Sequence, residues 1–379
     1  MALCGALRRL ASAPAMPGEL VGLQYLRGIA ALMVVLDHGS GMIALPHYLG
    51  REPFGGLLKT GRVGVDLFFC ISGFIIVYAS LHADGTPRHG IAEYARRRFA
   101  RIVPFLWFAV LLYAALKYVG RGPGDFVPYL RALALFPIGD LEPNVVWTLR
   151  HEMLFYAVFA VAFLASPRMR RYVGIPFLAI WLTGPIASAA AGLGGAGAGW
   201  ELARFLLNPV NLLFGMGMAA AFLFFRVGRH GFSPFWQRTL LIGLLVGLMP
   251  MAGILHYDRL AIGPILLIGL ASSFSIFLAA LVAHGGGMTA RLGKLLGDAS
   301  YSVYLTHTLF ISIMLSVATR YAPGMSPEAL LAILFIVATL GGVALRILVE
   351  KPLVDWTRSL LRRGTQSGRR RQPQAVLNR

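Results

Sequence analysis

The chain has 379 residues, of which 57% are hydrophobic and 13% are charged, and its mean hydropathy is +0.69. These values exclude a soluble globular protein and are typical of a membrane protein that crosses the bilayer many times. The formal net charge of +19 would suit nucleic-acid binding, but the placement of the basic residues argues against a nucleic-acid partner.

Ten apolar stretches are each near the ~20 residues that a helix needs to cross a bilayer. Helices are expected because every backbone polar group in hydrocarbon must be bonded within its own segment. The sequence therefore predicts an all-α fold, a polytopic membrane bundle of about ten transmembrane helices. The stretches are 22–45, 63–82, 102–119, 145–165, 172–191, 205–225, 239–255, 262–283, 300–319 and 329–349.

Short loops leave room for one integral membrane domain, 22–349, between a cytoplasmic N-terminal segment, 1–21, and a basic cytoplasmic tail, 350–379. Most of the 35 Lys and Arg residues lie in alternate loops and in the tail, so the positive-inside rule puts both termini in the cytoplasm. We expect the tail to be disordered and close to anionic lipid.

The first span is expected to be a retained helix. Of the two cysteines, Cys4 is expected in the cytoplasm and Cys70 in the second span, and no spacing predicts a disulfide or a metal site.

The first span carries Arg27 near its inner end and His38 in its outer half. At ~100° per residue, their separation corresponds to about three full turns, so both side chains share one face about 16 Å apart along the axis. A lone histidine on a helix is often a packed hydrogen-bonding residue. A shared face with an arginine at the membrane edge favours a functional histidine.

Three acidic residues, Asp37, Asp66 and Glu152, lie inside apolar stretches, where lipid penalises a charge. The second and fourth spans begin outside, which places Asp66 and Glu152 at a depth similar to that of His38. A carboxylate beside an imidazole fixes its tautomer and stabilises its protonated form, as a general base requires. The alternative is a buried polar network that holds the bundle together, with Arg150 neutralising Glu152.

On the cytoplasmic side, Arg98 and Arg101 are three residues apart and so are neighbours on one helix face. Their guanidinium groups could hold phosphates, although the ordinary inside bias of positive charge explains them equally well. Tyr304 and His307 also share a face, within reach of an inner cavity, or they serve as interfacial anchors. A charged inner mouth and a polar path along the first helix would suit coenzyme A, with its thioester reaching His38.

Gly215, Gly217 and Ala219 in the sixth span are typical of close helix packing.

Several sequence blocks together resemble the membrane acyltransferase-3 family, in the form found in exopolysaccharide and O-antigen O-acetyltransferases. The blocks follow one another along all ten spans and are Leu26-Arg27-Gly28-Ile29-Ala30-Ala31 with His38, Gly64-Val65-Asp66-Leu67-Phe68-Phe69 with Ser72-Gly73-Phe74, Arg98-Phe99-Ala100-Arg101-Ile102-Val103-Pro104, Trp147-Thr148-Leu149 with Glu152-Met153 and Phe155-Tyr156, Leu296-Gly297-Asp298-Ala299-Ser300-Tyr301-Ser302 with Tyr304-Leu305-Thr306-His307, and Val349-Glu350-Lys351-Pro352.

The resemblance implies transfer of an acyl group, commonly acetyl from cytoplasmic acetyl-CoA, to a hydroxyl of a cell-surface or lipid-linked glycan, in a bacterial inner membrane. It matches Arg27 and His38 to the arginine and essential histidine of the first span, and Arg98 with Arg101 to a paired-arginine motif. Acyl-CoA is then a donor substrate, and no tightly bound cofactor is expected.

His38 would act as general base or carry the acyl group as a relay, oriented by Asp37, Asp66 or Glu152. Arg27, Arg98, Arg101, Tyr304 and His307 would bind the donor. The pocket would also contain Trp147 and three candidate oxyanion donors, Ser72, Arg150 and Tyr156. The alternative function is a transporter or flippase of a lipid-linked sugar or acyl donor, in which the same charges line a path and perform no chemistry.

Overall fold

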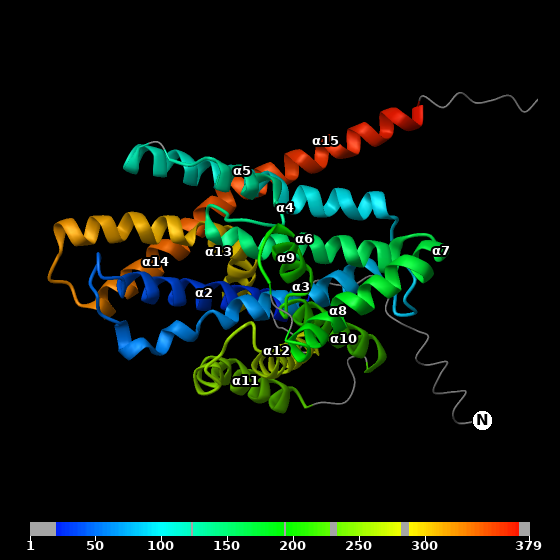
Figure 1. The fold of residues 1–379 in the computed structure, drawn as a ribbon, viewed down its shortest axis with the longest axis horizontal. Helices are drawn as coiled ribbons and strands as arrows, with labels where there is room; N and C mark the ends of the chain where they lie inside the picture. The colour runs from blue at the N-terminus through cyan, green and yellow to red at the C-terminus, as the bar shows by residue number, and fades with distance from the viewer. Residues whose placement is uncertain (1–19, 123, 193–194, 228–232, 282–287, 371–379) are drawn as a thin grey trace, which may run out of the picture.

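The structure is a computed structural model that describes residues 20–122, 124–192, 195–227, 233–281 and 288–370 (Figure 1). Within these ranges the protein is helical, has no strand, and contains ten helical segments long and apolar enough to cross a membrane. The predicted all-α bundle of about ten spans is therefore confirmed. The N-terminal residues 1–19, which include Cys4, and the end of the tail, 371–379, lie outside the described residues.

The helices follow in chain order. They are α2 (Val21–Ile43), α3 (Val63–Ser80), α4 (Ile91–Arg121), α5 (Val127–Ala134), α6 (Trp147–Phe159), α7 (Pro167–Met169), α8 (Ile175–Ala190), α9 (Ala198–Leu206), α10 (Asn211–Val227), α11 (Pro234–Ile254), α12 (Ile262–Leu281), α13 (Met288–Tyr321), α14 (Pro327–Leu345) and α15 (Lys351–Arg370). Two 3-10 helices, η1 (Pro53–Thr60) and η2 (Asn144–Val146), and three π-helical segments, η3 (Ala160–Leu164), η4 (Arg170–Gly174) and η5 (Arg346–Glu350), join them.

Several helices are longer than the apolar stretches that predicted them, because apolarity ends at the hydrocarbon boundary whereas helical hydrogen bonding continues. Helix α4 begins at Ile91, well before the apolar stretch 102–119, and so carries the whole arginine run on helical backbone. Helix α14 begins where the sequence provides a cap, since the Ser326 side chain accepts a hydrogen bond from the backbone of Ala329 and Pro327 follows at the first helical position.

Helix α2 lies at the centre of the bundle and packs against α3, α12, α13 and α14, while α3 packs in turn against α10 and α12. In the most apolar window of the span containing α3, 72% of the residues are buried, against 17% for the spans containing α8 and α11. Helices α8 and α11 therefore lie at the periphery of the bundle. Figure 1 shows most long helices running along the longest axis of the molecule.

The contact between α3 and α10 depends on glycine. A Cβ atom on Gly217 would lie 1.9 Å from the Cys70 carbonyl oxygen, and one on Gly73 would lie 2.2 Å from that of Phe214. The predicted close packing is therefore confirmed for Gly217. Gly215 faces only the flexible end of Leu182, and Ala219 is exposed.

The prediction of a disordered tail is wrong for most of its length, since α15 continues to Arg370 and packs against α4 (Figure 1). The disorder prediction relied on the many basic residues of the tail, which are typical of a solvated segment. Apolar residues at helical spacing stabilise the helix, and among them Val354 is 3% exposed.

Candidate functional site

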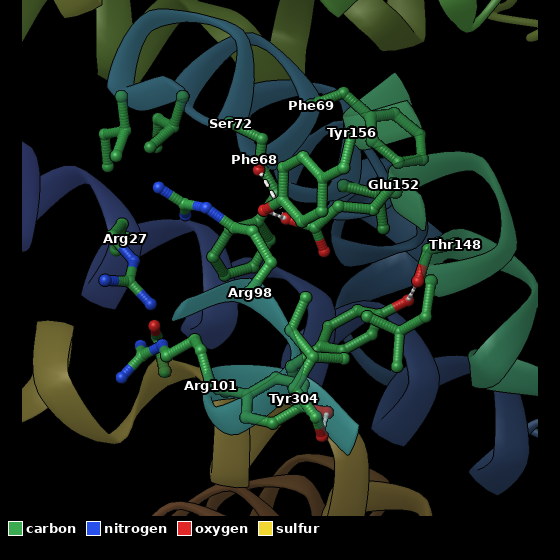
Figure 2. A pocket seen from close by; sticks show the side chains of 17 residues that line it. Arg27, Phe68, Phe69, Ser72, Arg98, Arg101, Thr148, Glu152, Tyr156 and Tyr304 are labelled. Atoms are coloured by element: carbon green, nitrogen blue, oxygen red, sulfur yellow. Dashed lines mark hydrogen bonds between the residues drawn. The ribbon is translucent and has the colours of Figure 1, made fainter. Parts of the chain in front are cut away.

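A cavity of about 130 Å³ lies among α2, α3, α4, α6 and α13, and we call it the inner cavity because it contains Arg27, which the sequence predicts at the cytoplasmic end of the first span. Figure 2 shows the guanidinium groups of Arg27, Arg98 and Arg101 on one side and Glu152 on the other. Three cationic groups face one carboxylate, so the cavity carries an excess of positive charge. The three arginines that the sequence analysis assigned to donor binding thus line one cavity, and their surroundings suit an anionic ligand.

Arg98, one of the three arginines, lies against two aromatic rings. Its guanidinium carbon lies 5.7 Å from the ring centre of Tyr94 and 5.3 Å from that of Tyr156. These aromatic faces stabilise the cation without occupying its hydrogen-bond donors. The neighbouring Arg96 and Arg97 instead donate to Glu93, at 2.8 Å and 2.7 Å. Helical geometry thus divides the arginine run into a cavity pair, Arg98 and Arg101, and a pair bound to Glu93.

Glu152 lies in the inner cavity and not beside His38. The Ser72 hydroxyl donates to its Oε1 at 2.9 Å, and the Tyr156 hydroxyl donates to the same oxygen. The expected common depth of Glu152 and His38 is not observed. Glu152 is five residues into α6, more than one turn from the helix start, and the packing of α6 places it in the cavity that Arg27 also lines.

Arg150 points away from both Glu152 and the cavity, because residues two apart on a helix face different directions. Its Nη1 donates to the carbonyl oxygens of Phe136 and Gly139, each at 3.1 Å. Arg150 therefore holds the loop before α6. It does not pair with Glu152, as the alternative interpretation expected, and it does not lie in the cavity, where an oxyanion donor would be needed.

A second cavity of about 420 Å³, which we call the outer cavity, contains His38, with Asp37, Arg62, Glu142 and Trp147 also in its wall. The His38 Nδ1 lies 3.0 Å from the carbonyl oxygen of Val34. A carbonyl oxygen only accepts, so this contact favours the neutral tautomer with its proton on Nδ1, in which Nε2 is the acceptor. Asp37 Oδ2 lies 3.8 Å from the same Nδ1. Of the three acids that the sequence singles out, Asp37 is the carboxylate beside His38.

Asp66 is fully buried and bound to a residue that the sequence analysis missed. Arg259, in the short loop between α11 and α12, donates from Nε to Asp66 Oδ1 at 3.0 Å, and its guanidinium lies 5.5 Å from the ring centre of Trp147. Burial lowers the pKa of Arg259, but the Asp66 carboxylate outweighs it and the net shift is upward. Asp66 thus anchors Arg259 in the outer cavity wall and does not orient His38. The sequence did contain one signal for Arg259: it is a basic residue in a loop on the side of the membrane that is expected to carry few basic residues.

His307 packs against His38 and does not line the inner cavity. The two ring centres are 4.8 Å apart and the ring planes are inclined by 72°. Its Nδ1 lies 2.6 Å from the Tyr304 carbonyl oxygen and its Nε2 is buried. The prediction that His307 faces an inner cavity with Tyr304 is therefore wrong, since one helical turn places it on the outer side.

Tyr304 and Val65 line both cavities and form a septum between them. The Tyr304 hydroxyl is 2.9 Å from the hydroxyl of Thr148 and donates to the Val145 carbonyl oxygen at 3.1 Å (Figure 2 shows the bond to Thr148). Arg27 and His38 lie on opposite sides of this septum along one helix, as their spacing predicts. The two cavities therefore approach each other at Tyr304.

Comparison with known proteins identifies the family. Residues 20–347 match the acyltransferase domain Acyl_transf_3. The chain belongs to the acyltransferase-3 family. This acyltransferase-3 protein is 34% identical over 319 residues to the exopolysaccharide production protein ExoZ of Rhizobium meliloti (strain 1021), covering 80% of this chain and 92% of that protein.

Two further relatives match shorter parts of the acyltransferase-3 protein. Protein 2 in the picA locus of Rhizobium radiobacter is 34% identical over 26% of this chain and 46% of its own length. The acyltransferase MdmB of Streptomyces mycarofaciens is 27% identical over 38% of this chain and 40% of its own length. No solved structure matches the chain. Together with its ten candidate spans, the family makes this protein a multi-pass membrane acyltransferase.

Proposed function

We propose that the protein is an O-acyltransferase of the bacterial cytoplasmic membrane that moves an acyl group, most simply acetyl, from cytoplasmic acyl-CoA to a hydroxyl of a cell-surface or lipid-linked glycan. The observation that carries this proposal is the pair of cavities that meet at Tyr304, one cationic and one containing His38. The name of the relative ExoZ, an exopolysaccharide production protein, favours a polysaccharide acceptor.

The inner cavity is proposed to receive the donor. Coenzyme A carries phosphates, and guanidinium groups bind phosphate through paired, charge-assisted hydrogen bonds. Arg27, Arg98 and Arg101 supply such groups, and only the Glu152 carboxylate opposes them in the cavity wall. The thioester would then point towards the septum, where Tyr304 lies.

The outer cavity is proposed to receive the acceptor hydroxyl. His38 Nε2 would remove the hydroxyl proton as the oxygen attacks the thioester carbonyl carbon, the C–S bond would break, and the proton would pass from the imidazolium to the departing thiolate. Asp37 would stabilise the imidazolium. The Tyr304 hydroxyl lies where the cavities meet, and it would become an oxyanion donor by turning its proton from the Val145 carbonyl oxygen towards the thioester oxygen; the hydroxyls of Ser72 and Tyr156 donate to Glu152.

The direct test adds radiolabelled acetyl-CoA to inside-out vesicles and follows label into the glycan fraction. Wild type should transfer label, whereas His38→Ala and Arg98→Ala should not. Two matched controls should transfer normally: His47→Ala, an exposed histidine in the loop after α2, and Arg97→Ala, which lies beside Arg98 but binds Glu93. Normal transfer by His38→Ala would refute the role of His38, and absence of CoA binding by wild type would refute the enzyme and favour the transporter alternative.

The proposed orientation, with both termini in the cytoplasm, can be tested with a cysteine reagent that does not cross membranes. Cys70 is fully buried, so labelling reports on Cys4. We expect labelling in inside-out vesicles and none in right-side-out vesicles, and the reverse pattern would refute the orientation.

A further inference from the structure

A buried carboxylate lies behind the inner cavity and has no part in the mechanism described so far. Glu350 is fully buried at the end of η5, the π-helical segment between α14 and α15. It does not line either cavity. Because burying an ionised carboxylate is costly unless it is paired, its partners should indicate its role.

Glu350 contacts groups from three elements. Arg346 Nη1 donates to Oε1 at 2.7 Å within η5, and the Ser302 hydroxyl on α13 donates to Oε2. Arg101 Nη1 on α4 lies 3.6 Å from Oε1. Among these partners, Arg101 is the residue that also lines the inner cavity, where 25% of its side chain is exposed.

The wall around Arg101 is fixed from a second direction as well. The Tyr301 hydroxyl donates to the Ile102 carbonyl oxygen at 2.9 Å, which joins α13 to the residue that follows Arg101. The backbone of α4 is thus held by Tyr301, and the guanidinium of Arg101 by Glu350. Without the carboxylate, Arg101 and Arg346 would repel each other across the space that it occupies.

We propose that Glu350 is a positioning residue that holds the Arg101 guanidinium in the wall of the inner cavity, in place to bind a phosphate of the acyl-CoA donor. This inference rests on the proposed function of that cavity. Glu350 itself touches no substrate and acts through Arg101.

The direction in which Glu350→Gln changes the affinity for coenzyme A distinguishes a positioning role of Glu350 from a purely electrostatic one. Replacing Glu350 by Gln removes a negative charge close to the cavity, and through charge alone this would tighten the binding of anionic coenzyme A. If Glu350 instead positions Arg101, the same substitution weakens binding, because the phosphate loses an aligned charge-assisted donor. Asp298 on α13 offers a matched control: it lines neither cavity, and its carboxylate lies 3.9 Å from Lys294.

The experiment measures the dissociation constant of coenzyme A for the purified full-length protein. Glu350→Gln should raise it roughly tenfold or more, while Asp298→Asn should leave it unchanged or lower it. In an Arg101→Ala background, Glu350→Gln should have less than about a twofold effect, since a residue that acts through Arg101 cannot act without it. Equal or tighter binding by Glu350→Gln, or a full tenfold loss in the Arg101→Ala background, would overturn the proposal.

Ser302→Ala keeps the proposal testable if Glu350→Gln does not fold. It removes one hydrogen bond from Glu350 and retains all charges, and it should weaken coenzyme A binding by a smaller factor that disappears with Arg101→Ala. Unchanged binding by Ser302→Ala would then overturn the proposal. Failure of wild type itself to bind coenzyme A would instead refute the proposed function of the inner cavity, so the two failures are distinguishable.

Discussion

Gly217→Ala should damage both the stability and the activity of this protein, because of where α10 meets α3. The new Cβ would lie 1.9 Å from the Cys70 carbonyl oxygen, a backbone atom. Side-chain rotation cannot relieve this contact. To reach even 3.0 Å, the helices must separate by about 1.1 Å, and overpacking of this kind costs about 1–3 kcal/mol of stability, or more.

The same displacement should reach the site, since α3 carries Val65 of the septum and Ser72, which donates to Glu152. A displacement of ~1 Å can lower a rate by ~100-fold. Gly215→Ala is the matched control, because its Cβ would meet the flexible end of Leu182 at 2.7 Å. The assays are thermal unfolding in detergent and transfer of radiolabelled acetyl to glycan. Equal melting temperatures and activities for both variants would refute the packing argument.

Other substitutions should separate the two cavities and test the buried ion pair. Asp37→Asn should lower kcat roughly tenfold with little change in the KM for acyl-CoA, because a charge 3.8 Å from His38 in a partly exposed site is worth about 1–2 kcal/mol. Glu152→Gln should mainly change the KM for acyl-CoA. Steady-state kinetics in vesicles would measure both variants. A change in KM for Asp37→Asn and in kcat for Glu152→Gln would contradict the placement of Asp37 beside His38 and of Glu152 in the inner cavity. Arg259→Met should lower the free energy of unfolding by about 3–5 kcal/mol, because it leaves Asp66 buried without its cationic partner. Thermal unfolding should show recovery in the double variant with Asp66→Asn, and no recovery would exclude the ion pair as the cause.

Features that depend on local periodicity could be predicted from the sequence. The ten spans follow from the length and apolarity of single segments, and the shared face of Arg27 and His38 follows from their spacing on one helix. The pairing of Arg98 with Arg101 follows in the same way, and the structure places all three arginines in one cavity.

Features that depend on how helices are placed against one another could not be predicted. Depth estimated from the start of a span put Glu152 beside His38, whereas the packing of α6 puts it with Arg27. Arg259 was missed because a loop of a few residues gives no periodic signal, although it supplies the partner of Asp66. His307 was assigned to the wrong side because it lies about one turn beyond Tyr304 on α13, where its ring packs against His38 and not into the inner cavity.

The septum also bears on the energetics of the cell. A continuous aqueous channel between the arginines and His38 would conduct protons and discharge the gradient that the membrane maintains. Tyr304 and Val65 line both cavities and lie between them, with the tyrosine hydroxyl held by Thr148 and Val145. An acyl group passed from one cavity to the other at these shared side chains would need no open channel, so the proposed reaction would export a chemical group from the cytoplasm without a path for protons.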